Sequence, residues 1–167
     1  MSNANQTPAS TSIAHYYDGW EKHNQLIARV IAPLTPEQLL LAPAPNMWSV
    51  SVLAAHIVAA RVFWFHAVMR EGPAELAPLQ KLDDGPESER TVANLLAGLA
   101  ATWGMIDGIL ARSNAENIDE TFKRVYPDRV RIVTRQWVIW HVLEHDIHHA
   151  GEISQTLGMY GLTGLDM

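Results

Sequence analysis

The segment WHVLEHDIHHAGE, residues 140–152, carries half of the eight histidines in this 167-residue chain. These four are His141, His145, His148 and His149. Residues four apart on a helix stand on one face, with Cβ atoms about 5–6 Å apart, so two imidazoles at this spacing can bind one metal ion. Two such pairs are present, His141 with His145 and His145 with His149. The segment therefore predicts a helix that contributes to a metal site.

A helical wheel favours the second of these pairs. At about 100° per residue, the apolar side chains of this helix gather on one broad face, and His149 and then His145 lie closest to it. That face comprises Val138, Ile139, Val142, Leu143, Ile147, Ala150, Ile153 and Leu157. His141 and His148 point further away. We expect His148 to face solvent or to contact a ligating histidine, and His141 is the main rival ligand.

His56, in WSVSVLAAHIVAARVFWF (residues 48–65), is the predicted third ligand. It shares a stripe at helical spacing with Leu53 and Ala60, so it faces the core. Burying an imidazole without a partner costs about 1–3 kcal/mol, and a metal shared with residues 140–152 removes that cost. A hydrogen-bonded core histidine is the alternative. Three neutral imidazoles favour Zn²⁺ or Ni²⁺ over Ca²⁺ or Mg²⁺, which prefer oxygen.

Four long segments have helical spacing, and links rich in Pro, Gly, Asp and Ser separate them. We expect helices over about residues 12–31, 49–70, 89–113 and 134–157, with Ser49 capping the second. The link 33–47 holds four prolines, with a short turn at Pro36–Leu40. The link 73–88 is expected to be a loop, and 114–133 an extended loop or a short hairpin. The simplest architecture is all-α, a four-helix bundle around one core. It forms a single domain over residues 11–167, after a disordered segment over residues 1–10.

Composition narrows the functional classes. The formal net charge is −6 and the basic residues are scattered, which argues against binding to nucleic acid. The chain has no cysteine, so disulfides, thiolate ligands and a cysteine nucleophile are excluded. The N-terminal residues show no secretory signal, and the long apolar stretches are interrupted by His or Arg, so we expect no membrane span. A soluble cytoplasmic protein is the expectation.

Two segments resemble the DinB/YfiT-like superfamily. HVLEHDIHHAGEISQTLGMYG, residues 141–161, is similar to the last helix of that family, whose usual form is close to His-x-x-x-His-x-x-His-His-x-Gly-Gln. NMWSVSVLAAHIVAA, residues 46–60, resembles its second-helix motif, in which Trp-Ser precedes the first metal histidine. The family's metal positions fall on His56, His145 and His149. The resemblance also implies an up-down-down-up bundle with a long crossover, commonly a homodimer.

The same resemblance implies an activity. Characterised relatives include thiol S-transferases and a mycothiol-dependent maleylpyruvate isomerase, which use a metal and a low-molecular-weight thiol. It therefore implies a metal-dependent thiol transferase or isomerase acting on a small molecule. Where family members often have Arg-Gly-Gln after the double histidine, this chain has Ala-Gly-Glu at residues 150–152, which adds a carboxylate to the polar side of the site.

The residues themselves leave several roles open. Three histidines without cysteine fit a metal site that keeps one position free for water or substrate. A metal-dependent hydrolase and a non-catalytic metal-binding bundle are the alternatives, and closure of the free position by His141 or a glutamate would favour the latter. Glu144 and Glu152 are candidate general bases. Trp137 and Trp140, one turn before the histidines, are candidates to line a pocket.

Overall fold

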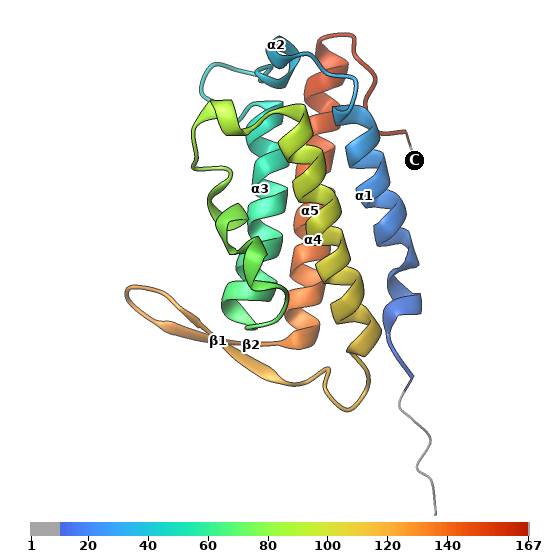
Figure 1. Cartoon of the computed structure of the whole chain (residues 1–167), viewed down its shortest axis with the longest axis vertical. Coiled ribbons are helices and arrows are strands. Elements are labelled where there is room, and N and C mark those ends of the chain that lie inside the picture. Colours follow the sequence, from blue (N-terminus) through green and yellow to red (C-terminus); the bar gives the residue numbers. More distant parts are fainter. Residues whose placement is uncertain (1–10, 167) are drawn as a thin grey trace, which may run out of the picture.

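The structure, a computed structural model, describes residues 11–166, so the predicted disordered segment 1–10 lies outside the described residues. Four long helices lie side by side (Figure 1). They are α1 (Asp18–Ile31), α3 (Val50–Val62, continued by the π-helix η2, Phe63–Val68), α4 (Val92–Arg112) and α5 (Arg135–Met159). In Figure 1 the chain ascends along α1, descends along α3 and α4, and ascends again along α5. Three of these helices begin and end within about three residues of the predicted positions, whereas α1 begins later than predicted because a 3₁₀ helix, η1 (Ala14–Tyr17), precedes it.

Hydroxyl side chains begin three of these helices. Ser49, Thr91 and Thr134 each accept a hydrogen bond from the backbone N–H three residues later. Each residue has extended backbone angles, as N-cap residues usually do. The predicted cap at Ser49 is therefore confirmed, and the start of each helix is encoded locally. A short helix α2 (Pro36–Leu39) begins in the same way at Thr35, where the sequence predicted a turn.

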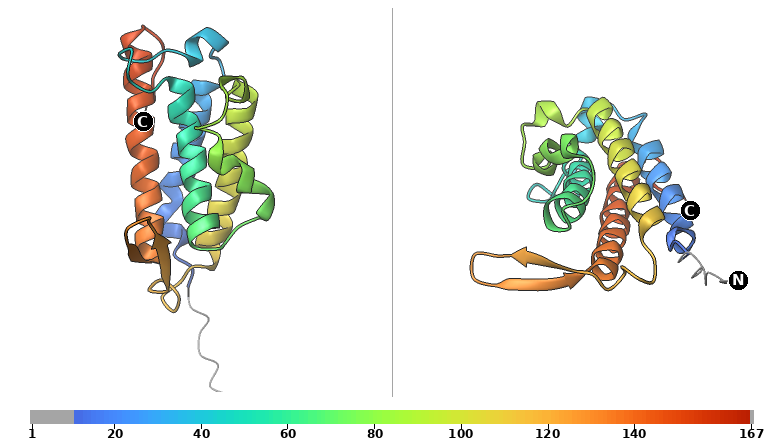
Figure 2. Two further views of the ribbon diagram at one scale, coloured as in Figure 1. Left: turned by 90° about the vertical axis from the view of Figure 1, so that its left-hand side faces the viewer. Right: turned by 60° about the horizontal axis from the view of Figure 1, so that its bottom comes forward.

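Because α3 and α4 run in the same direction, the chain must return along the bundle between them. The 21 residues of α4 span about 31 Å at 1.5 Å per residue. Residues 69–91 make this return along the outside of α3 (Figure 2, left). The expectation of a plain loop over 73–88 was wrong, because the segment forms two 3₁₀ helices, η3 (Ala74–Lys81) and η4 (Glu87–Glu89). Buried Leu76 and Leu82 hold it against the bundle.

A small hairpin corrects the all-α prediction. Strand β1 (Thr121–Val125) pairs antiparallel with β2 (Val130–Thr134), and Phe122 stands opposite Val133. Figure 2 (right) shows the hairpin projecting from the end of the bundle where α5 begins. Of the two alternatives for 114–133, the hairpin is the one observed. The fold is therefore mainly helical with one two-stranded hairpin.

The central helix α3 with η2 is the most apolar part of the bundle. By length and composition alone, Val50–Val68 and Val92–Arg112 could each cross a membrane. Most of the first of these is buried inside the bundle, which accounts for its apolar composition. Its contact with α4 is close at Gly98, where a Cβ would stand 3.0 Å from a methyl carbon of Val58.

A buried polar network joins all four long helices. Arg61 and Asp146 are both fully buried, and their side chains pair at 2.7 Å. Arg61 also donates to Asn24 Oδ1 at 2.8 Å and to Thr102 Oγ1 at 3.2 Å. The indole N–H of Trp20 donates to Asp146 Oδ2 at 2.7 Å. Because removing one partner of a buried ion pair costs about 3–5 kcal/mol, this network constrains how the helices pack.

Candidate metal centre

Two neighbouring helices bring three histidines to one point. His56 lies in the middle of α3, and His145 and His149 lie one turn apart on α5. One ring nitrogen of each lies within 4.8 Å of a ring nitrogen of the other two. The Nε2 atoms of His56 and His145 are 3.1 Å apart. The structure thus brings together the three residues that the sequence singled out as metal ligands.

Two carboxylates orient two of these rings. Asp83 Oδ2 lies 2.7 Å from Nδ1 of His56, and Glu152 Oε2 lies 2.6 Å from Nδ1 of His149. An ionised carboxylate only accepts hydrogen bonds, so in each pair Nδ1 carries the proton and donates. The tautomer that remains has a free lone pair on Nε2. This carboxylate–histidine arrangement is the usual support of metal-binding imidazoles.

The geometry of the triad fits a tetrahedral divalent ion. At Zn–N distances of about 2.0–2.1 Å, two nitrogens on one tetrahedral ion stand about 3.3 Å apart. The separation of 3.1 Å between His56 and His145 is close to that value. Nδ1 of His145 is buried and has no hydrogen-bond partner within residues 11–166. With three imidazoles as the donor set, the residues present fit a borderline ion such as Zn²⁺ or Ni²⁺.

Burial favours the neutral form of His145 and His149. It lowers the pKa of His145, with smaller contributions from the neighbouring His149 and His56 because protonated imidazoles repel one another, and together these effects bring that pKa to about 3. Burial also lowers the pKa of His149, against the opposing effect of its hydrogen bond to Glu152. Because an imidazole must be neutral to bind a metal, both effects favour ligation at neutral pH.

The other candidate residues on α5 lie around the triad rather than in it. The ring of His141 stacks on Trp137 at 4.6 Å and is 6.2 Å from the ring of His145. Burial lowers the pKa of His141. Glu144 is exposed and lies 3.6 Å from Nδ1 of His141. Trp140 is 58% exposed, so its ring is largely in solvent.

His148 and Ile147 lie on the outer side of α5. His148 is exposed, as the wheel predicted, with Nε2 3.7 Å from Glu152 Oε1. Ile147 is 52% exposed, although the wheel placed it on the buried face. The apolar face of α5 is therefore narrower than the sequence pattern indicated.

Two residues beside the triad were missed by sequence reasoning. Asp83 lies in the crossover, 27 residues from its partner His56, and no local pattern links the two. Trp48 was not among the predicted site residues, yet its ring centroid lies 4.8 Å from that of His56 and 6.0 Å from that of His149. The only sequence feature that indicated Trp48 was its place in the Trp-Ser pair that precedes the helix of His56.

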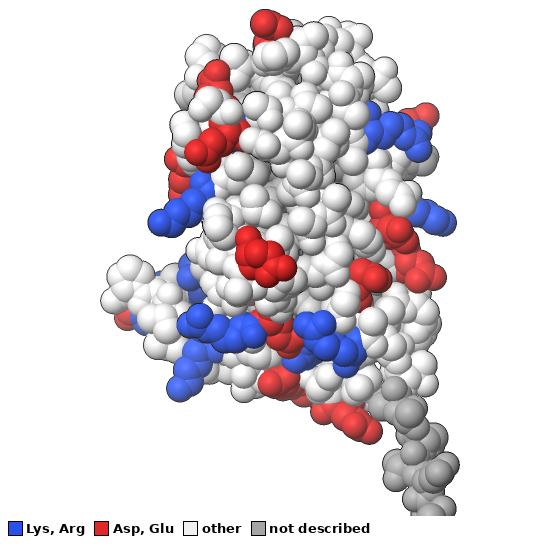
Figure 3. All heavy atoms as spheres, viewed as in Figure 1, with Lys and Arg blue, Asp and Glu red and all other residues white. Residues whose placement is uncertain are grey.

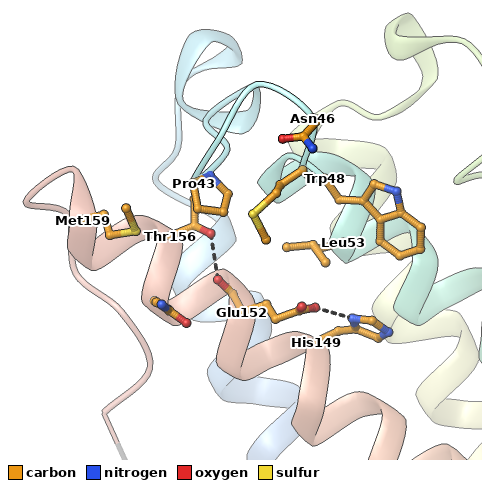
Figure 4. A pocket seen from close by; sticks show the side chains of 10 residues that line it. Pro43, Asn46, Trp48, Leu53, His149, Glu152, Thr156 and Met159 are labelled. Atoms are coloured by element: carbon orange, nitrogen blue, oxygen red, sulfur yellow. Dashed lines mark hydrogen bonds and ion pairs between the residues drawn. The ribbon is translucent and has the colours of Figure 1, made fainter.

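Cavities flank the triad on two sides. One, of about 410 Å³, is lined by His149 and Glu152 of α5 and by apolar side chains that include Trp48, Leu53 and Met159. In Figure 4 these side chains surround an open space, with Glu152 hydrogen-bonded to His149 at its floor. The other cavity, of about 280 Å³, is lined by His56 and His145 among other residues. A ligand bound at the triad could therefore extend into either cavity.

Comparison with known proteins places this geometry in a family. The model of the DinB superfamily matches residues 20–153, which include all three histidines. The chain belongs to the DinB superfamily. Among curated proteins, none matches the sequence significantly.

Solved structures share the DinB-like fold. A DinB-like protein from Bacillus cereus is 17% identical with a TM-score of 0.70, and the match covers 95% of this chain and 99% of that one. A conserved protein from Enterococcus faecalis is 18% identical with a TM-score of 0.67, and the match covers 89% of this chain and 96% of that one. A DinB-like protein from Bacillus subtilis is 18% identical with a TM-score of 0.52, and the match covers 93% of this chain and 94% of that one. At these identities the likeness concerns the fold alone.

Proposed function

We propose that this DinB-superfamily protein is a metal-dependent enzyme that uses a low-molecular-weight thiol, as a transferase or an isomerase, on a small-molecule substrate. The observation that carries the proposal is the incomplete ligand set. Three histidines converge, whereas the residues that could close the site, His141, Glu144 and Glu152, make other contacts. His141 stacks on Trp137, and Glu152 accepts a hydrogen bond from His149. One coordination position is then left for a substrate atom.

The chemistry follows from that free position. A divalent ion held by these three imidazoles would supply a lower pKa for a bound thiol, and so a thiolate at neutral pH. Glu152 lines the cavity beside His149 and is the candidate acceptor of the thiol proton. In a transfer, the sulfur forms a bond to an electrophilic carbon while the leaving group departs with its electron pair. The apolar wall of this cavity, with Leu53 and Met159, suits an apolar acceptor.

Two alternatives use the same ion without a thiol. A metal-dependent hydrolase would use bound water as the nucleophile, and a non-catalytic metal-binding protein would have no substrate. The two flanking cavities favour an enzyme over the non-catalytic alternative, since small-molecule sites are concave with a few convergent polar groups. The carboxylates of Asp83 and Glu152, which orient two of the histidines, are compatible with a hydrolase and with a non-catalytic protein.

The test is a turnover screen. Untagged, zinc-loaded protein is assayed with bacillithiol, mycothiol and glutathione against a chlorodinitrobenzene acceptor and against maleylpyruvate. We expect turnover with at least one thiol, and loss of that turnover to background in His145→Ala. His15→Ala, a change at an exposed histidine near the start of α1, serves as the control and should keep full activity. Metal uptake without turnover of any thiol would contradict the proposal, and thiol-independent ester hydrolysis would favour the hydrolase.

A further inference from the structure

The smaller cavity beside the triad contains a guanidinium from the hairpin. Arg124 of β1 lines it together with His56 and His145. Phe63 and Trp64, the first residues of the π-helix η2, form part of its wall. The guanidinium carbon of Arg124 lies 4.0 Å from the centre of the Phe63 ring and 6.0 Å from that of Trp64. A cation is therefore held on aromatic faces in the same cavity as two of the predicted metal ligands.

Arg124 differs from the other arginines that face the bundle. Arg61 and Arg135 each pair with carboxylates. Within residues 11–166, Arg124 has no carboxylate within 4.0 Å. Its Nε is buried and makes no hydrogen bond there. Because the protein itself covers Nε, a ligand would bind the two terminal guanidinium nitrogens, which lack a carboxylate partner in the same residues.

The acidic residues of the cavity do not neutralise this cation. Asp83 is turned toward Nδ1 of His56, and its other oxygen accepts the backbone N–H of Asp84. Asp84 is exposed. With a divalent ion on the triad, Asp83 and Glu152, the carboxylates that contact its rings, would balance the ion, and the guanidinium would remain uncompensated. On the face shown in Figure 3, Lys and Arg side chains gather toward the end of the bundle that carries the hairpin.

Local backbone geometry helps to build this wall. The π-helix η2 continues α3 directly, and such segments shift the direction of the side chains that follow a regular helix. Here it begins at Phe63, the ring on which the guanidinium lies. Arg124 itself comes from β1, so the hairpin that corrects the all-α prediction is also the element that delivers the cation.

We propose that Arg124 binds a carboxylate of the small-molecule ligand whose other end reaches the metal. This rests on the proposed function and narrows its substrate class to molecules that carry both a metal-binding group and a carboxylate. A guanidinium matches a carboxylate with two parallel hydrogen bonds, and stacking on Phe63 leaves its N–H edge free to donate. A cavity of about 280 Å³ suits such a molecule rather than an extended chain.

The experiment measures a charge preference by calorimetry. Zinc-loaded wild type, Arg124→Gln and Arg129→Gln are each titrated with imidazole-4-acetate and with its uncharged amide. The imidazole ring of both probes coordinates zinc, so binding does not depend on thiol chemistry. The two probes differ in the basicity of their rings, but this difference is the same for all three proteins. It therefore cancels when the ratio of the acid's affinity to the amide's affinity is compared between proteins. Arg129 is the matched control, because it lies on the same hairpin but is exposed and pairs with Asp128.

Wild type and Arg129→Gln are expected to prefer the acid by about tenfold, the value of a charge-assisted hydrogen bond, and Arg124→Gln is expected to lose that preference. An equal preference in all three proteins, or an equal loss in both variants, overturns the proposal. If thiol turnover fails while the Arg124-dependent preference persists, the proposed function fails and the anion site stands. If no zinc binds, the affinities for the acid and the amide are measured on the metal-free protein by tryptophan fluorescence. Equal affinities for the two probes would then overturn the proposed anion site as well.

Discussion

Adjacent residues of α5 belong to two different polar clusters. Asp146 is fully buried and pairs with Arg61, and its other contacts come from Trp20 on α1. His145 faces His56 instead, beside a cavity, with one ring nitrogen unpartnered within residues 11–166. Both clusters join α3 to α5. One is closed and satisfied by the protein itself, and the other is open on the side of a cavity.

This difference separates a structural role from a binding role. In the closed cluster, each charge has a partner in the protein, so a ligand could only replace existing bonds. In the open cluster, two carboxylates fix the rings of His56 and His149 but leave lone pairs directed at one point. Removing a group from the first cluster should therefore cost stability, and removing one from the second should cost ligand affinity. The predictions below test that division.

The largest effect is expected at Asp146. Replacement by Ala leaves the Arg61 guanidinium buried without its counter-charge and removes the acceptor of the Trp20 indole. We expect the free energy of unfolding to fall by about 3–5 kcal/mol. Urea denaturation followed by circular dichroism measures this. In the metal-free protein, His145→Ala should cost far less, and an equal loss for the two variants would remove the distinction between the clusters.

An intermediate effect is expected at Asp83. Asp83→Asn takes away the carboxylate that fixes the His56 ring but leaves all three ligands in place. We expect zinc affinity to fall by about 10- to 100-fold, as is typical when a partner of a ligating histidine is lost. Competition with a chelating dye measures the affinity. Asp84→Asn is the matched control at the next position, and it should bind zinc as wild type does.

The smallest effect is expected at Thr134, which caps α5 and thus precedes both clusters. Thr134→Ala removes the hydrogen bond that the hydroxyl accepts from the backbone N–H of Trp137. We expect a loss of about 1 kcal/mol in the free energy of unfolding, with zinc affinity unchanged. Thr163→Ala, at an exposed position beyond the end of α5, should be neutral. A change in zinc affinity with Thr134→Ala would mean that the cap also positions the histidines.

The sequence predicts what is encoded in short-range patterns. Helical spacing and the cap at Ser49 locate the helices, and the four-residue spacing of His145 and His149 identifies one half of the site. His56 follows from its place in an apolar stripe. The wheel failed at Ile147, because regular periodicity does not say how much of a helix the neighbouring elements cover.

Long-range pairs were beyond that reasoning. Asp83 contacts His56 from the crossover, and Arg124 lines the same cavity from the hairpin, so their positions depend on how residues 69–91 and 114–134 fold back on the bundle. The Arg61–Asp146 pair was not predicted either. A single arginine within an apolar stretch does indicate a buried partner, but it does not say which residue that partner is. Tertiary packing decides these contacts.

The central claim is that three histidines form one metal site, and the metal content of untagged protein tests it most directly. Elemental analysis of protein purified without a histidine tag should find about one divalent ion per chain, as expected for a single three-histidine site. His56→Ala and His145→Ala should each lose that ion, whereas the exposed-histidine variant His148→Ala should retain it. Equal metal content in all four proteins, or no metal in wild type even after incubation with zinc, would contradict the account.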